Sequence, residues 1–205
     1  MWSEQIIMML LEGIKDTLYM TLTSTLIGYV IGLPMGILLT VTDKDGIHPN
    51  AAVYKVLDVI ANLIRSVPFL ILLIVLIPFT RFLIGRSYGP TATIVPLVIA
   101  AAPYIARMVE SSLKEVDAGV IEAARSMGAS NFTIVTKVML VEARTSLIVG
   151  ATISLGTILG YSAMAGTVGG GGLGDIAIRY GYTRWQTDIM VVTVILLVIL
   201  FQIFQ

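Results

Sequence analysis

The sequence predicts an all-α integral membrane protein with five transmembrane helices. Of its 205 residues, 57% are hydrophobic and only 13% are charged, and the mean hydropathy is +0.93. Soluble domains carry roughly 25% charged residues. A transmembrane helix requires about 20 mostly apolar residues, and five segments approach that length: Thr17–Val41, Val56–Phe79, Ala92–Val109, Leu147–Val168 and Ile189–Phe204. These spans leave no room for a separate soluble catalytic domain, so we expect a single domain.

The first span contains small residues at regular intervals. Gly28, Gly32 and Gly36 recur every four residues, and the same stripe continues in Thr17, Thr21, Ser24 and Thr25. Such a stripe permits close packing of helices in a membrane. It indicates either a static interface or a helix that slides or tilts. Because the span is long and lacks a cleavage-site pattern, we expect it to be retained rather than removed as a signal peptide.

Polar residues are grouped in the second span before Pro68. This segment contains Asp58, Asn62, Arg65 and Ser66. Polar groups at membrane depth must face protein or water, so we expect Arg65 to avoid lipid. The favoured placements are a pairing with Asp58 or a position on a helix that protrudes into the cytoplasm. Contact with a small solute is the alternative.

The fourth span presents polar and flexible side chains on one helix face. The residues are Ser154, Thr157, Tyr161 and Met164, which are separated by three, four and three positions, so they share one helix face. Ser162 is adjacent to Tyr161 in the sequence. This uncharged surface suits a small, mostly apolar or zwitterionic solute better than phosphate, which is usually held by Arg or Lys. For each of these residues, plain packing is the alternative.

Two glycines of the fourth span form a GxxxG pair. Gly156 and Gly160 lie on an adjacent part of the helix surface, where they could bring a second helix close. We expect Ile158, between them, to face lipid.

A short amphipathic segment lies between the third and fourth spans. Asp117 is placed to cap a helix, and Gly128 to end it in the left-handed conformation before Ser130 starts another helix. The pattern predicts a helix, a sharp turn and a second helix. This unit indicates a docking surface, and the alternative is an ordinary amphipathic connector.

The segment resembles the EAA loop of bacterial ABC-importer permeases through Glu122-Ala123-Ala124, Gly128 and Val138-Met139-Leu140. The resemblance implies a cytoplasmic coupling helix within residues 117–144 that inserts into a cleft on an ATPase. The residues expected to dock the ATPase are Glu122, Ala123, Ala124, Arg125, Met127 and Gly128. Two positions depart from the family pattern, Val138 for Ile and Val141 for Pro. The second departure leads us to expect a straighter helix after the turn.

Four further runs of the chain are Tyr161–Gly174, Arg179–Tyr182, Ile77–Arg81 and Ala101–Glu110. They resemble the methionine-uptake branch of the ABC permeases. The resemblance implies one ABC-importer transmembrane domain over residues 1–205, two copies of which form a pathway for D- or L-methionine. It also implies two ATPases that bind ATP and Mg, and an external lipid-anchored binding protein. The chain itself is expected to have no cofactor, metal or catalytic residue.

In such a dimer we expect Tyr161, Ser162 and Met164 to lie at or beside the solute constriction. The unbranched thioether of Met164 could plug a narrow pore yet move aside, and a twofold axis would bring two copies of it together. The glycine-rich residues 169–174 are expected outside, where they either meet the binding protein or form a tight turn.

Flanking Lys and Arg residues indicate the orientation of the spans. Seven of them lie in loops on the side of the EAA segment and five on the other side. We therefore expect the bacterial inner membrane, with the N-terminus outside and the C-terminus inside.

The apparent catalytic motifs of the sequence lack the structural context that each of them requires. Glycines within 169–174 match G-x-G-x-x-G, but they follow a transmembrane helix rather than a strand. Ser162 lies in half of a nucleophile elbow, yet Met164 replaces its second Gly, and the only histidine, His48, lies in a loop on the other side. The chain has no Cys, and its spans lack sets of carboxylates or histidines suited to a metal.

Two alternatives to a methionine permease stay open. One is a permease for another small apolar amino acid. The other is an ATP-independent carrier or channel, which would require titratable residues inside the membrane for ion coupling. Apart from Asp58 and Arg65, the spans offer few.

Overall fold

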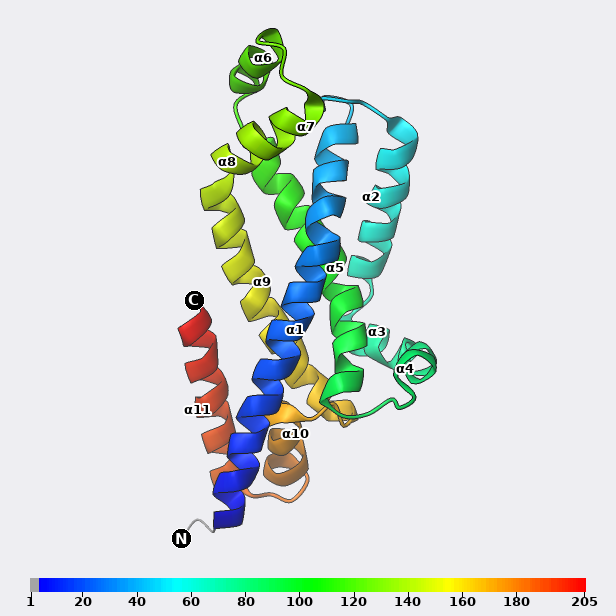
Figure 1. Cartoon of the computed structure of the whole chain (residues 1–205). Helices are drawn as coiled ribbons and strands as arrows, with labels where there is room; N and C mark the ends of the chain where they lie inside the picture. Colours follow the sequence, from blue (N-terminus) through cyan, green and yellow to red (C-terminus); the bar gives the residue numbers. More distant parts are fainter. Residues whose placement is uncertain (1–3) are drawn as a thin grey trace. The chain divides into compact units, whose positions relative to one another are not determined.

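The computed structural model describes residues 4–205, and all regular structure in that range is helical, as the sequence predicts (Figure 1). In chain order the helices are α1 (Glu4–Thr42), α2 (Ala51–Ser66), α3 (Phe69–Val75), α4 (Ile77–Ile84), α5 (Pro90–Lys114), α6 (Ala118–Ser126), α7 (Asn131–Thr133), the π-helix η1 (Ile134–Met139), α8 (Leu140–Glu142), α9 (Arg144–Ala165), the 3₁₀-helix η2 (Gly166–Val168), α10 (Gly172–Ile176), the π-helix η3 (Ala177–Tyr182) and α11 (Thr187–Phe204).

Four helical stretches within residues 4–205 are long and apolar enough to cross a membrane. They are α1, α5, the stretch from Arg144 to Tyr182, and α11. The number of spans reaches five when the broken pair of α2 and α3 is counted as one.

The predicted continuous helix over Val56–Phe79 is wrong. Helix α2 ends at Ser66, and Pro68 is the N-cap of α3 with φ −55° and ψ 134°. Proline lacks a backbone N–H and disfavours the α conformation of the residue before it, Val67, so a helix breaks at this point.

The chain forms two compact units. The first contains the described residues up to 27 together with 67–100 and 155–205, and the second contains 28–66 and 101–154. Helices α1, α5 and α9 each contribute one part to each unit.

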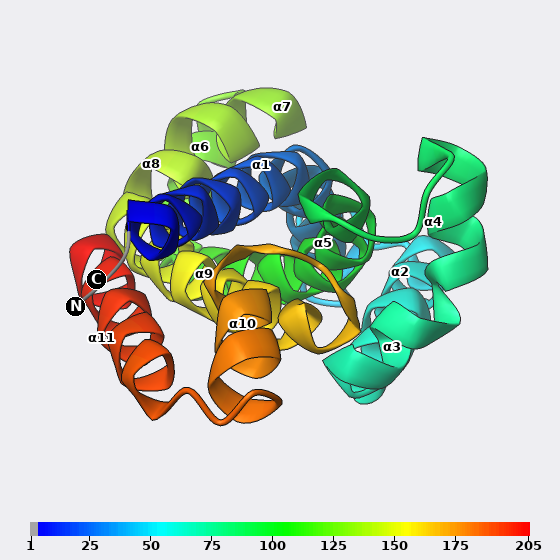
Figure 2. The same ribbon diagram turned by 90° about the horizontal axis from the view of Figure 1, so that it is seen from below.

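The core of the first unit joins parts of α1, α9, α10 and α11. Helix α11 lies beside α10 and is connected to it through η3 (Figure 2). The buried side chains of this core are Leu10, Leu159, Leu173, Ile176, Ile189 and Leu200.

The glycine-rich segment of the first unit is a tightly packed turn. Gly169, Gly171 and Gly172 adopt positive φ angles. Residues that carry a Cβ atom rarely adopt this conformation, whereas glycine does so readily. The backbone N–H of Leu173 donates a 2.9 Å hydrogen bond to the hydroxyl of Thr17 on α1, and Leu173 is fully buried. Of the two expectations for residues 169–174, the tight turn describes this geometry.

The GxxxG pair of α9 packs at only one of its two glycines. A Cβ added at Gly156 would lie 2.8 Å from the Phe201 ring of α11, so a larger residue at this position would displace that ring. No atom lies within 4 Å of a Cβ built at Gly160. Among residues 4–205, close packing is therefore seen at Gly156 alone, and for Gly160 it stays a prediction.

The second unit uses the glycine stripe of α1 to pack against α5. A Cβ at Gly32 would lie 2.6 Å from the carbonyl oxygen of Ala102, and one at Gly36 would lie 2.5 Å from that of Ala106. Gly28 faces Ala101 and Ile105 at slightly larger distances. Because the obstacles are backbone atoms, the two helices approach as closely as glycine permits.

The segment after Gly128 is not one straight helix. It passes from α7 through η1 to α8 and is interrupted at Ala143, where α9 follows at Arg144. The expectation of a straighter helix after the turn is not met, because the π turn of η1 adds a residue to the hydrogen-bonded ring.

Candidate functional site

Helix α6 has the local geometry that its sequence predicts. The carboxylate of Asp117, the N-cap, accepts a 2.7 Å hydrogen bond from the backbone N–H of Gly119. The turn after α6 contains Gly128 with φ +81°, and Ser130 caps α7 by accepting from the N–H of Thr133 at 3.2 Å. Two caps and one glycine therefore define the helix, turn and second helix.

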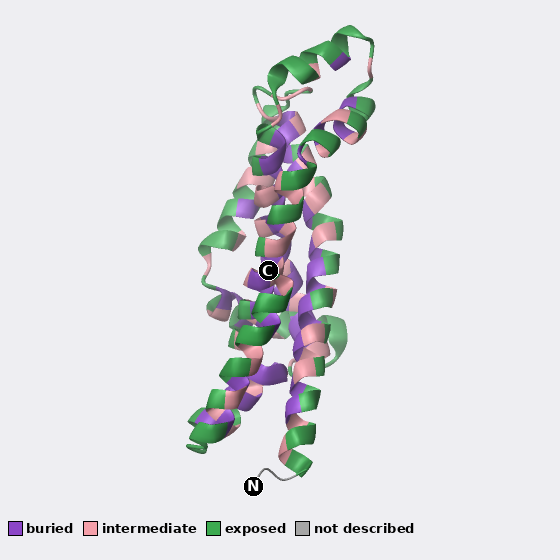
Figure 3. Cartoon of the chain, turned by 90° about the vertical axis from the view of Figure 1, so that its left-hand side faces the viewer, coloured by how far each residue is buried: buried purple, intermediate pink, exposed green. Residues whose placement is uncertain are grey.

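One side of α6 packs against η1, and the rest is on the surface (Figure 3). Ala124 is buried, with 5% of its surface exposed. Met127 and Phe132, 82% and 78% exposed, place large apolar side chains on either side of the turn. Such grouped apolar side chains are typical of protein interaction sites. The exposed members of the predicted docking set are Glu122, Ala123, Arg125, Met127 and Gly128.

Phe132 is a residue that the sequence pattern did not single out. A large aromatic residue two positions after a helix cap reads as a core residue, but here it is exposed. Its position four residues after the left-handed Gly128, in the first turn of the next helix, is the signal that could have identified it.

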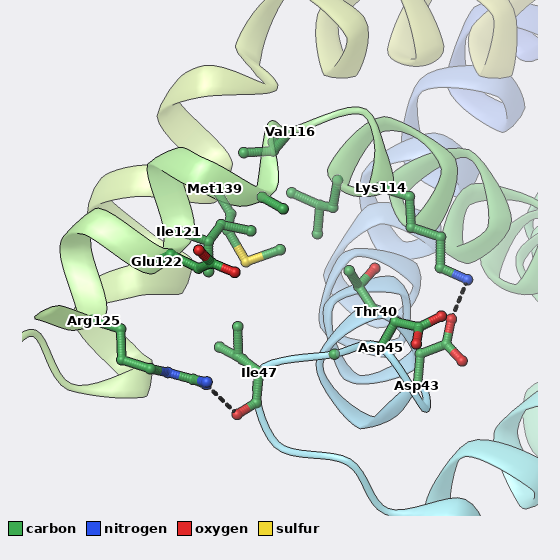
Figure 4. Close-up of a pocket in the computed structure, with 13 residues that line it drawn as sticks. Thr40, Asp43, Asp45, Ile47, Lys114, Val116, Ile121, Glu122, Arg125 and Met139 are labelled. Atoms are coloured by element: carbon green, nitrogen blue, oxygen red, sulfur yellow. Dashed lines mark hydrogen bonds and ion pairs between the residues drawn. The ribbon is translucent and has the colours of Figure 1, made fainter.

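Arg125 turns back toward its own chain. Its Nη2 donates a 2.7 Å hydrogen bond to the carbonyl oxygen of Ile47 in the loop between α1 and α2 (Figure 4). Beside this bond, α6, the loop and the end of α5 enclose a cavity of about 420 Å³, which Glu122 also lines. Arg125 thus ties α6 to the α1–α2 loop.

Lys114 holds the same loop at a second point. Its Nζ lies 2.6 Å from the Asp43 carboxylate and 2.8 Å from that of Glu110 (Figure 4 draws the Asp43 contact). The hydrogen bond from Lys114 holds the pKa of Asp43 below its ordinary value. We call the four residues Asp43, Ile47, Lys114 and Arg125 the loop brace, because they fasten the loop to both α5 and α6.

A charged network continues from the loop brace along α5. Arg107 pairs with Asp58 of α2 and, at 2.6 Å, with Glu110. The Tyr54 hydroxyl of α2 donates to Glu110 at 3.4 Å, and Arg107 Nη2 donates to Asn62 at 3.0 Å. This network fastens α2 to α5 through ionic and polar contacts.

The expected pairing of Arg65 with Asp58 is wrong. Asp58 pairs with Arg107 instead, and Arg65 is exposed at the end of α2. Arg65 lies about two helical turns after Asp58 along α2, whereas Arg107 reaches Asp58 from the neighbouring helix. The sequence signal for the network was the spacing of Arg107, Glu110 and Lys114 on one face of α5.

The two serines of the predicted pathway are buried within the chain. Ser154 and Ser162 are 0% and 1% exposed. Their hydroxyls donate to backbone carbonyls one turn earlier, at Gly150 (2.8 Å) and Leu159 (2.7 Å). Thr157 is partly buried. The hydroxyl groups of both serines are therefore hydrogen bonded within α9.

Tyr161 stacks on an aromatic ring that the sequence pattern did not connect with it. The rings of Tyr161 and Phe69 lie 4.5 Å apart between centroids, with 6° between their planes. Phe69 is the first residue of α3, directly after Pro68, and is 7% exposed. The break in the second span thus positions the partner of Tyr161.

Met164 is the predicted pathway residue with the most exposed side chain, at 50%. The expectation that Ile158 faces lipid is wrong, because it is 0% exposed. Helical periodicity correctly predicts which residues of α9 share a face, but we expected the face with Ile158 to be outside the core, and it is buried.

No group of three or more His, Cys, Asp or Glu residues in the described part of the chain is arranged to hold a metal ion. Charged residues of the second unit form ion pairs instead, which join Arg107 to Asp58 of α2, Arg107 to Glu110 within α5, and Lys114 to Asp43 in the α1–α2 loop.

Comparisons with known proteins agree with this architecture. A family model described as the inner membrane component of binding-protein-dependent transport systems matches residues 12–205. The probable D-methionine transport system permease protein MetI of Vibrio cholerae is 48% identical over 197 residues, which cover 96% of this chain and 88% of that protein. The D-methionine transport system permease protein MetI of Escherichia coli K12 is 51% identical over 164 residues, 80% of this chain and 76% of that protein.

Solved structures are similar as well. A chain of the MetNI methionine ABC transporter in an inward-facing conformation matches with a TM-score of 0.97 and 50% identity, covering 100% of this chain and 94% of that chain. A chain of an amino acid ABC transporter shares the fold, with a TM-score of 0.79 and 21% identity. The resemblance to ABC-importer permeases is thereby confirmed, and so is the interpretation of the chain as a transport subunit. This protein belongs to the family of inner membrane components of binding-protein-dependent transport systems.

Proposed function

We propose that the chain is the permease of an ATP-driven importer for D- or L-methionine. Relatives with 48% and 51% identity are named for D-methionine transport, and the aligned regions include most of each chain. In the structure, the observation that supports ATP coupling best is α6, a capped helix with exposed Met127 beside the left-handed Gly128.

The working assembly consists of two copies of this chain, two cytoplasmic ATPases that bind ATP and Mg, and an external lipid-anchored methionine-binding protein. Each chain carries one α6, so two copies offer two docking helices to two ATPases. A closed twofold arrangement is the commonest symmetry for such a pair.

The N-terminus lies outside and the C-terminus inside in this proposal. The excess of Lys and Arg on the α6 side supports it. The same orientation brings α6 to the cytoplasm, where an ATPase reaches Glu122 and Met127.

Movement of the ATPase is transmitted through the second unit. Docked α6 is packed on η1 and hydrogen bonded through Arg125 to the α1–α2 loop. Lys114 connects that loop to α5, and Arg107 connects α5 to α2. A displacement of α6 therefore acts on three helices rather than one. The ATP-bound state of the partner shifts the population toward the arrangement to which it binds better.

The solute passes beside Met164 and Tyr161. Met164 is half exposed within one chain, so its side chain is available to line a pathway shared with a second copy. An aromatic ring and a thioether make favourable contacts with the thioether of methionine. The stack on Phe69 orients the Tyr161 ring.

Uptake by reconstituted vesicles tests the function. The chain, its ATPase and its binding protein are placed in vesicles with internal ATP, and entry of radiolabelled L- and D-methionine is measured. We expect uptake that requires ATP hydrolysis and that excess unlabelled leucine does not inhibit.

Two results would replace the proposal. Uptake that leucine or another small apolar amino acid inhibits as strongly as methionine would favour the broader permease. Equal uptake with ATP and with a non-hydrolysable analogue would favour the ATP-independent carrier or channel.

A further inference from the structure

The corner between η3 and α11 carries exposed aromatic and basic side chains that the transport mechanism does not use. Residues 182–188 are all exposed, including Tyr182 at 67% and Trp185 at 85%. Trp185 is the only non-glycine residue between positions 4 and 205 with a positive φ, 57°. A large side chain in this conformation is costly, and at Trp185 it belongs to a residue that is almost fully exposed.

A groove adjoins this corner within the first unit. It has a volume of about 270 Å³ and is lined by Gln5, Ile6, Met9, Tyr180, Gln186 and Ile189. Its wall is polar and apolar in equal parts, with the side-chain amides of Gln5 and Gln186 beside the apolar side chains of Ile6, Met9 and Ile189. It is smaller than the roughly 300–1,000 Å³ of typical small-molecule pockets, so it fits the upper segment of a longer amphipathic chain better than a whole soluble ligand.

Arg184 is available for an anion beside the groove. Its guanidinium carbon lies 4.5 Å from the centre of the Tyr180 ring, which fixes the group over the groove wall. No carboxylate among residues 4–205 lies within 4.0 Å of Arg184, whereas Arg179 is paired with Asp175 at 2.6 Å. A stacked guanidinium keeps its N–H groups free to bind phosphate oxygens.

The corner directly precedes the most apolar of the candidate spans found within residues 4–205. Helix α11 begins at Thr187, its most apolar window has a mean hydropathy of 2.5, and only 17% of that window is buried. Residues from its start and from the start of α1 line the same groove. Trp, Tyr and Arg at the end of a span belong at the level of the lipid headgroups, where apolar chains and phosphates lie side by side.

We propose that this corner is a binding site for an anionic phospholipid. The guanidinium of Arg184 holds the headgroup phosphate, and the groove walls at Ile6, Met9 and Ile189 take the upper part of an acyl chain. Trp185 lies in the headgroup region and fixes the depth of α11. The site is independent of the transported solute.

Trp185 provides its own reporter, because the chain has only two tryptophans, Trp2 and Trp185. The full chain with the Trp2→Phe substitution is placed in phosphatidylcholine vesicles, and the fluorescence of Trp185 is measured. The vesicles contain a quenching lipid with bromine on the upper part of its acyl chain, which is either brominated phosphatidylglycerol or brominated phosphatidylcholine. The two quenchers are compared at equal mole fraction. Since one basic group near an anionic surface enriches such lipids several-fold, we expect at least about twofold stronger quenching by the brominated phosphatidylglycerol.

Matched variants assign the effect to Arg184. Arg184→Gln should make the two lipids equal quenchers, and Arg86→Gln, which removes another exposed arginine, should leave the difference intact. Excess inorganic phosphate at constant ionic strength should change neither result.

Each opposite outcome overturns the site. Equal quenching in the parent chain would mean that the corner does not select anionic lipid, and no quenching would mean that it faces water or a protein. A preference that survives Arg184→Gln would remove the assigned phosphate ligand. A preference abolished by inorganic phosphate would indicate a site for a free anion.

Discussion

The guanidinium of Arg125 and the carbonyl oxygen of Ile47 lie 2.7 Å apart, although 78 positions separate the two residues. Arg125 belongs to α6, and Ile47 to the loop that Lys114 fastens at Asp43. The helix proposed to dock the ATPase is therefore hydrogen bonded to the chain that it would move. We take Arg125 to be a positioning residue of α6 as well as part of the docking surface.

Replacement of Arg125 should separate docking from coupling. Arg125→Ala removes the bond to Ile47 but leaves Glu122, Met127 and the Gly128 turn in place. We expect the ATPase to co-purify while uptake per ATP falls several-fold, since a hydrogen bond of this type contributes about 1 kcal/mol. Lys137→Ala, which removes another exposed charge nearby, should leave the ratio unchanged. Loss of co-purification with Arg125→Ala would make it a docking contact only.

The packing of α1 on α5 predicts a graded effect of alanine in the glycine stripe. Gly32→Ala places Cβ against the Ala102 carbonyl at 2.6 Å, so backbone must move, and overpacking of this kind costs about 1–3 kcal/mol. At Gly28 the nearest atom is the flexible Ile105 side chain at 3.0 Å, so Gly28→Ala should cost less.

Thermal unfolding of the purified protein measures this order. Gly160→Ala is the control, because no atom lies within 4 Å of the added Cβ. Equal unfolding temperatures for Gly32→Ala and Gly160→Ala would contradict the close approach of α1 to α5.

Arg107 should stabilise the second unit through two carboxylates. Arg107→Gln leaves Asp58 and Glu110 without their shared cation. Because Arg107 is neither exposed nor fully buried, we expect a loss of about 1–3 kcal/mol, between the values for surface and buried ion pairs. Adding Asp58→Asn should restore part of the loss.

Arg65→Gln is the matched control for Arg107, since Arg65 is an exposed arginine of α2. Its unfolding temperature should equal that of the unmodified chain. If Arg65→Gln destabilises as much as Arg107→Gln, the network does not have the importance we assign to it.

Met164→Ala should loosen the solute pathway. Removal of a flexible thioether enlarges a constriction, so we expect ATP-uncoupled passage of methionine or a wider choice of solutes. Ile199→Ala of α11 is a suitable control because the two side chains are similarly exposed, 49% and 50%. Unchanged rate, coupling and selectivity with Met164→Ala would return the pathway assignment to Thr157 and Tyr161.

Local chemistry made α6 predictable from the sequence. Asp117, Gly128 and Ser130 act on backbone groups within a few residues, so their caps and turn follow from residue type and order. The close packing of α1 was also predictable from its glycine stripe, since membrane helices approach each other closely where small residues recur on one face.

Long-range pairing was not predictable in the same way. Asp58 could choose between Arg65 on its own helix and Arg107 on α5, and only the approach of the helices decides for Arg107. Ile158 shows the same limit, because periodicity defines the faces of α9 but not which face meets another helix. The break at Pro68 was foreseeable from proline alone, but the apolar residues around it concealed it.

Co-purification and uptake with α6 variants test the central claim, that α6 couples this chain to an ATPase. Glu122→Lys reverses an exposed charge of the docking surface, and Gly128→Val forces a branched residue into φ +81°, at a cost of about 1–2 kcal/mol or more. Each variant is expressed with the ATPase, with Glu142→Lys, another exposed glutamate, as the control. We predict that both α6 variants lose bound ATPase or ATP-dependent methionine uptake while the control keeps both. Normal co-purification and normal uptake in both α6 variants would contradict the claim.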